Sequence, residues 1–111
     1  MMVVFFDPGR MTARLDLEAP APLSDGQGGA VVEWQARSSL WARIEPVSFV
    51  VTETGMARIG TVSHRIWIGF RQGVEPGMRF RKGARLFAIG LVRDPDETAR
   101  YLVCHCEEEK S

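Results

Sequence analysis

Apolar residues recur at every second position through most of the second half of this chain. Four segments show this spacing, and each ends at a turn signal rich in glycine, proline or aspartate. Alternation between such breakers predicts short β-strands in an antiparallel meander and argues against helices. The four predicted strands cover residues 61–70, 78–82, 85–92 and 100–107.

The first half begins with another alternating segment, residues 11–18, which predicts a half-buried strand. The residues after it include Pro20 and Pro22, which lack the backbone N–H that a sheet ladder needs. We therefore expect the strand to stop there. A glycine-rich stretch follows, so residues 19–30 are predicted to form a flexible loop.

Two further strands are predicted over residues 31–36 and 40–47, with Ser38-Ser39 between them as a bend or a β-bulge. Residues 48–60 show no clear register and are predicted to form a second long loop. These segments bring the expected number of short strands to six to eight.

The chain ends are expected to lie outside the folded body. Residues 1–10 contain the turn Asp7-Pro8-Gly9 and predict a loose N-terminal arm, and residues 107–111 form an acidic tail. The length of 111 residues fits one domain with one modest core. We therefore predict a single domain over residues 1–111, mainly all-β, built as a small antiparallel β-barrel or sandwich with long loops.

Aromatic residues mark the expected core. Phe80 is predicted to anchor one short strand, with Arg79 and Arg81 pointing away from the core. His64 shares a strand face with isoleucines, which predicts a hydrogen-bonded core histidine. Residues 85–92 are apolar on both faces, so this strand should be central and covered on both sides, by the fold or by a neighbour. One of its faces is predicted to hold Phe87, Ile89 and Leu91.

Composition is ordinary for a soluble globular protein, with 45% hydrophobic and 25% charged residues. No apolar window approaches the ~18–20 residues that a membrane span needs. The first six residues are apolar but have no basic region before them, so no secretory signal is expected. Cys104 and Cys106 lie one residue apart and are interpreted as reduced thiols, which favours the cytoplasm.

Formal net charge is zero, which argues against a generic binder of polyanions, but the charges are unevenly spread. Between Arg58 and Arg93 there are eight basic residues and one acid. Folding either gathers these cations into a strip that faces a channel or an acidic partner, or disperses them over a solvated surface. The candidates for a channel-facing or partner-facing role are Arg58, Arg71, Arg79, Arg81 and Lys82.

No catalytic or cofactor-binding residue is predicted, so we expect the chain not to be an enzyme. Cys104-His105-Cys106 is the one cluster that looks metal-binding, but neighbouring strand residues point to opposite faces and a second ligand pair is missing. The serines have no nucleophile-elbow motif near them.

Five short motifs, in this order and spacing, resemble the head–tail joining proteins of long-tailed bacteriophages. This family is also called head completion or stopper proteins, and gene transfer agents carry it too. The resemblance covers roughly Met11 to Glu108. It is carried by LWARIEP at residues 40–46, HRIWI at 64–68, PGMRF at 76–80, the glycine, leucine, phenylalanine and isoleucine within 83–89, and DPDE at 94–97.

The resemblance implies a small β-barrel that assembles as a ring of six or twelve copies. It implies as partners a portal or adaptor ring, a tail terminator or tail tube protein, and double-stranded DNA passing through the channel, with no membrane. The ring would be assembled in the bacterial cytoplasm and then lie in the neck of the particle, whether phage, prophage remnant or gene transfer agent. Residues 48–60 become the candidate loop that holds DNA back. The candidate subunit contacts are Trp41, Arg43, Arg65 and Trp67.

The basic residues leave one alternative open. A free-standing small β-barrel that binds nucleic acid would show the same strand pattern and would use the cations between Arg58 and Arg93 for phosphate contacts.

Overall fold

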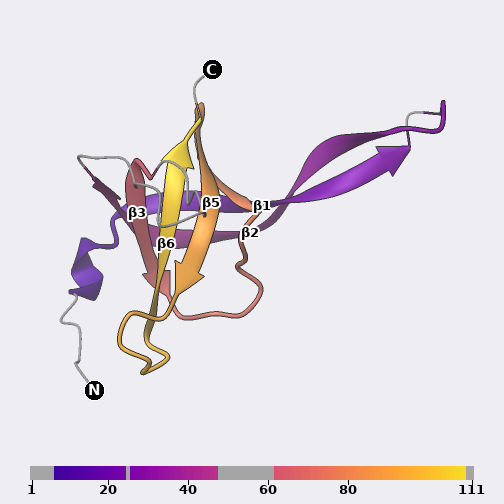
Figure 1. The fold of residues 1–111 in the computed structure, drawn as a ribbon. Coiled ribbons are helices and arrows are strands. Elements are labelled where there is room, and N and C mark those ends of the chain that lie inside the picture. The colour runs from indigo at the N-terminus through magenta and orange to yellow at the C-terminus, as the bar shows by residue number, and fades with distance from the viewer. Residues whose placement is uncertain (1–6, 25, 48–61, 110–111) are drawn as a thin grey trace, which may run out of the picture.

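Six antiparallel strands follow one another along the described chain and close into a barrel (Figure 1). The computed structural model describes residues 7–24, 26–47 and 62–109. A short 3-10 helix, η1 (Pro8–Arg10), precedes the strands. The strands are β1 (Ala13–Ser24), β2 (Ala30–Pro46), β3 (His64–Gly69), β4 (Arg79–Lys82), β5 (Arg85–Arg93) and β6 (Tyr101–Glu108).

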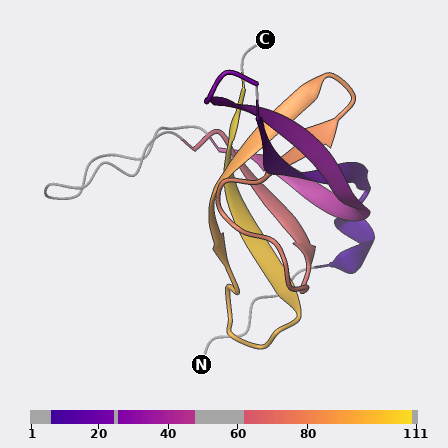
Figure 2. The ribbon, with the colours of Figure 1, turned by 90° about the vertical axis from the view of Figure 1, so that its right-hand side faces the viewer.

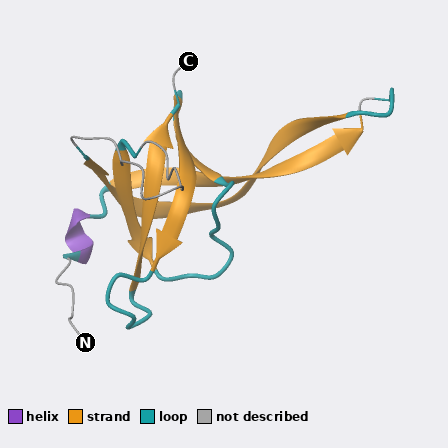
Figure 3. Ribbon diagram, viewed as in Figure 1, coloured by secondary structure: helices purple, strands orange, loops and turns teal. Residues whose placement is uncertain are grey.

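The order around the barrel is β1-β2-β3-β6-β5-β4, and pairing of β1 with β4 closes it. Figure 3 shows that strands and connecting loops make up almost all of the described chain. The prediction of a mainly all-β antiparallel barrel is therefore confirmed. The four strands predicted in the second half appear as β3, β4, β5 and β6, with ends shifted by at most three residues.

The core consists of the apolar side chains that alternate inward along these strands. Phe80 and Phe87 are fully buried, as are Leu15 and Ile66. Each such side chain contributes about 1.5–3 kcal/mol when it leaves water. The prediction that Phe80 anchors the core is confirmed.

The first two strands continue beyond the barrel as a long two-stranded ribbon, which we call the arm (residues 19–36). Figure 1 shows it reaching away from the barrel, and Figure 2 shows the same ribbon from its end. The longest dimension of the molecule is 52 Å, against 36 and 26 Å for the other two. The radius of gyration, 15.3 Å, exceeds the ~13 Å of a compact domain of about 100 residues.

The arm corrects the prediction that the first strand stops at the prolines. Pro20 pairs with Trp34 and Pro22 with Val32, so β1 runs on to Ser24 and the loop predicted over residues 19–30 shrinks to the turn before Ala30. Each strand of a two-stranded ribbon has one side without a partner, and a proline on that side removes no ladder hydrogen bond. The two prolines are two residues apart, so their ring nitrogens face the same side.

Two register shifts alter which side chains face the core. The first leaves Arg37 without a partner between the pairs Leu17–Ser38 and Glu18–Ala36, close to the predicted bend at Ser38-Ser39. β2 is therefore one continuous strand with a bulge, where two strands were predicted.

The second shift lies in β5, between Ile89 and Leu91. It turns Val92 toward the core and leaves Leu91 47% exposed. The prediction that Leu91 shares the core face of Phe87 and Ile89 is wrong, because a bulge reverses the alternation beyond it. Within the described chain, the outer face of β5 is not covered at Leu91.

Candidate interaction surfaces

Arg79 and Arg81, which were expected to point away from the core, converge on one carboxylate. Arg79 Nε donates to Oε1 of Glu18 at 2.6 Å, and Arg81 Nε donates to Oε2 at 2.9 Å. The side chains of Arg79 and Glu18 are only 11% and 10% exposed. The Arg79 guanidinium also lies over the ring of Trp34, 4.1 Å from its centre. We call these four residues the Glu18 cluster.

The Glu18 cluster lies where the arm leaves the barrel. The pairing of β1 with β4 ends at Glu18, which is opposite Arg79. Trp34 belongs to the arm, where it pairs with Pro20. Burial raises the pKa of the Glu18 carboxyl, but the hydrogen bonds and charges of Arg79 and Arg81 outweigh it, so the pKa lies below its usual value. The carboxylate is therefore charged at neutral pH and fixes both arginines. Sequence reasoning missed Glu18 because it lies 61 residues from Arg79.

Other cations of the predicted basic strip also have partners. Arg85 makes a two-bond contact with Glu108, at 2.9 and 3.0 Å. Arg93 donates to His105 Nε2 at 3.1 Å. Of the named candidates, Arg71 and Lys82 are exposed and make no ion pair with any described residue, and Arg58 lies outside the described residues. Ion pairs with Glu18 and Glu108 thus neutralise part of this positive charge.

Three of the four candidate contact residues meet at Glu45 on the outside of the barrel. Arg65 Nε lies 3.0 Å from Glu45 Oε1, and Arg43 Nη2 lies 3.7 Å from Oε2. Trp67 Nε1 donates to Oε1 at 3.4 Å. Trp41 lies on the same face of β2 and is 54% exposed, with the guanidinium of Arg14 5.1 Å from its ring centre.

The pairing register extends this face across β6 and β5. Arg65 pairs with His105, and His105 pairs with the exposed Leu91. The next row carries Trp67, Val103 and Arg93. We define the outer sheet face as Trp41, Arg43, Glu45, Arg65, Trp67, Leu91, Arg93 and His105.

The outer sheet face is cationic and partly apolar. Burial lowers the pKa of His105, and the charges of Arg93 and Arg65 lower it further. His105 is therefore neutral at physiological pH, and the arginines supply the charge. An acidic partner with apolar side chains would match this face.

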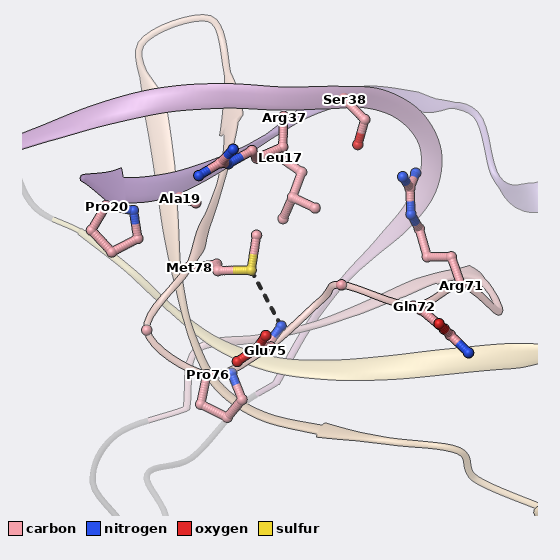
Figure 4. Close-up of a pocket in the computed structure, with 12 residues that line it drawn as sticks. Leu17, Ala19, Pro20, Arg37, Ser38, Arg71, Gln72, Glu75, Pro76 and Met78 are labelled. Atoms are coloured by element: carbon pink, nitrogen blue, oxygen red, sulfur yellow. Dashed lines mark hydrogen bonds between the residues drawn. The ribbon is translucent and has the colours of Figure 1, made fainter.

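An open groove of ≈ 510 Å³ lies between the base of the arm and the loop of residues 71–78 (Figure 4). The loop is held to the barrel by Gly77, whose N–H donates to the Ile89 carbonyl at 3.0 Å, and by the buried Val74. Gly77 has a φ of 94°, which favours glycine. Apolar atoms of Leu17, Ala19 and Met78 line the groove, with Arg37 and Arg71 at its edges.

His64 is the first residue of β3 and follows, in sequence, the loop predicted over residues 48–60. Its Nδ1 is 2.8 Å from Ser63 Oγ, and its ring meets Phe87 edge to face. The predicted hydrogen bond is present, but the His64 side chain is 13% exposed and lies at the margin of the core rather than within it. Burial lowers the pKa of His64. Val47 N–H donates to the Ser63 carbonyl at 2.9 Å and so holds together the residues that flank segment 48–61. The candidate DNA-retaining loop itself lies outside the described residues.

Cys104 and Cys106 are both buried on the core side of β6. Burial raises the pKa of Cys104 to about 12 and that of Cys106 further. His105 lies on the other face, as expected from strand alternation. The described ranges contain no group of three or more His, Cys, Asp or Glu residues that could hold a metal ion. No helix among the described residues is long and apolar enough to cross a membrane.

Comparisons with known proteins agree with this fold. A family model described as phage head completion protein matches residues 6–109. The structure is similar to a chain of the virion of a native gene transfer agent particle, with a TM-score of 0.67 and 28% identity over 90% of this chain and 96% of that one. It also shares its fold with protein SF1141 from Shigella flexneri 2a, with a TM-score of 0.69 and 24% identity over 93% and 96% of the two chains. Among curated proteins, none matches the sequence. Since the family model spans nearly the whole chain, this protein belongs to the phage head completion protein family and is a structural protein of head-and-tail particles.

Proposed function

We propose that copies of this chain form a ring at the head–tail interface, which joins the portal or adaptor ring to the tail and helps retain packaged DNA. The family match over residues 6–109 carries this proposal. The similarity to a chain of a gene transfer agent virion supports it, because that chain comes from an assembled particle.

Exposed apolar side chains give the proposal a physical basis. An isolated barrel would leave them in water, whereas a ring covers them through contacts between copies and with neighbouring rings. They lie on the outer sheet face, on the arm and at Phe70, the residue after β3. They are Trp41, Leu91, Leu23, Val31, Val32 and Phe70, each at least 43% exposed.

The charges suggest how the ring treats DNA. Arg71 and Lys82 are exposed without an ion-pair partner among the described residues, and together with Arg58 they are candidates to face the channel or a partner. Residues 48–60 are the candidate segment that reaches toward the DNA. Six or twelve copies would form the ring in the bacterial cytoplasm, next to a portal or adaptor ring and a tail terminator or tail tube protein. No enzymatic step is part of this role.

Particles made without this chain test the proposal. We expect heads without attached tails and a loss of DNA protected from nuclease, both restored by the unaltered chain. The variant Trp41→Ser should fold normally, because this side chain is 54% exposed, yet reduce the number of complete particles. Trp41→Phe keeps an aromatic contact and is the matched control. Complete DNA-filled particles without this chain would refute the proposal.

The free-standing nucleic-acid binder predicts a different result with the purified chain. The monomer would bind DNA at micromolar concentration, with affinity falling steeply as salt rises. Replacing Arg79 or Arg81 would not test this, because both arginines hold Glu18. The informative change is Arg71→Ala with Lys82→Ala, which would abolish such binding.

A further inference from the structure

We propose that the arm of one copy docks in the groove at the base of the arm of a second copy, with Glu33 of the first copy meeting Arg37 and Arg71 of the second. The inference rests on the proposed ring and names the two surfaces that adjacent copies use. One surface is an exposed ribbon face, and the other is the ≈ 510 Å³ groove.

One face of the arm combines an apolar tip with a single charge. Leu23 and Val31 are directly paired across the ribbon, so their side chains lie on the same face, and they are 43% and 54% exposed. Ala21 and Glu33 form the next pair on that face, about 7 Å further along the strands. Glu33 is exposed, and the sequence from Pro20 to Ala36 contains two acids and no base.

The groove has the complementary character. Leu17, Ala19 and Met78 contribute apolar atoms to its lining. Arg37 and Arg71 lie at its edges, and neither makes an ion pair with any residue in the described part of the chain. Figure 4 shows Arg37 on the wall formed by β2 and Arg71 on the wall formed by the loop. Glu75 also lines the groove, so these three side chains carry a net single positive charge.

The bulge in β2 shapes one wall of the groove. Ser38 lies in this wall, with its hydroxyl buried and without a hydrogen-bond partner among the described residues. Arg37 is placed beside it by the bulge in β2, which leaves this residue outside the ladder.

The arm of the same copy cannot be the occupant. β1 and β2 leave the groove as one continuous paired ribbon, so the tip at Leu23 and Val31 cannot turn back to the base of the same arm. A contact between two different surfaces repeats from copy to copy, and it closes into a ring when the rotations between copies add up to a full turn. A ribbon tip buries less than the ~1,000 Å² typical of a stable interface, so the contact should form mainly where a partner ring holds copies side by side.

Disulfide trapping in assembled particles tests the docking. The variant Val31→Cys with Gln72→Cys places one thiol on the arm face and one in the groove. Mild oxidation should yield a ladder of linked copies on a non-reducing gel. The background is low because Cys104 and Cys106 are buried. The matched control is Val32→Cys with Gln72→Cys. Val32 is adjacent to Val31 in β2, so its side chain lies on the opposite face of the ribbon, and this variant should give no ladder.

Exchanging the charges of Glu33 and Arg71 tests the same contact without a covalent cross-link. Glu33→Arg alone and Arg71→Glu alone should each reduce complete particles by about tenfold, because like charges then oppose each other in the groove. The two changes together should restore most of the yield. Both positions are exposed, so the folding of the purified variants should be unchanged.

The outcomes separate this inference from the proposed ring. A ring that microscopy shows in the particle neck, but whose copies give no ladder through positions 31 and 72, refutes the docking and leaves the ring standing. Dimers from Val31→Cys alone would show arm-to-arm contact, and linkage to a different protein would show that a neighbouring ring holds the arm; either result refutes the docking. Absence of the chain from particles refutes both proposals.

Discussion

Replacing Glu18 by glutamine should destabilise the barrel by about 3 kcal/mol, which makes this carboxylate a test of how the arm is fixed. Glutamine keeps the size and shape of the side chain but removes the charge that Arg79 and Arg81 share. The Arg79 side chain is only 11% exposed, so its guanidinium would remain buried without a counter-ion.

The magnitude follows from the burial of each partner. Removing one member of a buried ion pair costs about 3–5 kcal/mol, because the other charge is left out of water. We take the lower end, since the amide oxygen of glutamine still accepts one hydrogen bond. Arg81 adds at most about 0.5 kcal/mol, because its side chain is 37% exposed and water can solvate it. A loss of about 3 kcal/mol corresponds to a fall in Tm of roughly 12 °C in a domain of this size.

The free energy of unfolding of Glu18→Gln is measured by urea denaturation beside the unaltered chain. Glu33→Gln is the matched control, because this carboxylate is exposed and its loss should change stability by less than about 0.5 kcal/mol. The double variant Glu18→Met with Arg79→Met should recover most of the stability, since an apolar pair replaces the ionic pair. A cost below about 0.5 kcal/mol for Glu18→Gln would refute the reasoning, because an exposed ion pair behaves that way.

Three further predictions use the same structure. Since the pKa of Glu18 is lowered from 4.5, its contribution to stability is complete above about pH 5 and is lost as the pH falls below 4.5; Tm measured from about pH 7 to about pH 3 should show this fall, and Glu18→Gln should flatten it. Phe87→Ala should cost about 3–5 kcal/mol in denaturant unfolding because the side chain is fully buried, whereas Leu91→Ala, at an exposed position, should cost less than about 1 kcal/mol; equal costs would contradict the bulge in β5. Cys104 and Cys106 should resist a thiol reagent at about pH 8 in the native protein and both react in denaturant, as mass spectrometry can record; labelling of the native protein would contradict their burial.

Part of the candidate site was predictable from sequence. Trp41, Arg43, Arg65 and Trp67 lie at positions that alternate with core residues, so period-two spacing alone places them on the outside of their strands. The convergence of Arg43, Arg65 and Trp67 on Glu45 depends on the register in which β2 pairs with β3. That register joins two strands that are separated in sequence. The groove left no signal in the sequence, because three separate segments build it.

The strand pattern, the antiparallel class and most core positions were determined by the sequence itself, because alternation is a local property that can be recognised within about six residues of a strand. Tertiary structure decided three other points. It allowed Pro20 and Pro22 inside a strand, because the arm leaves one side of that strand unpaired. It turned Leu91 outward, because a bulge beside it reverses the register. It took Arg79 out of solvent, because a carboxylate 61 residues away in sequence lies in the adjacent strand. Each of these depends on contacts between distant segments, and such contacts exist only once the barrel has closed.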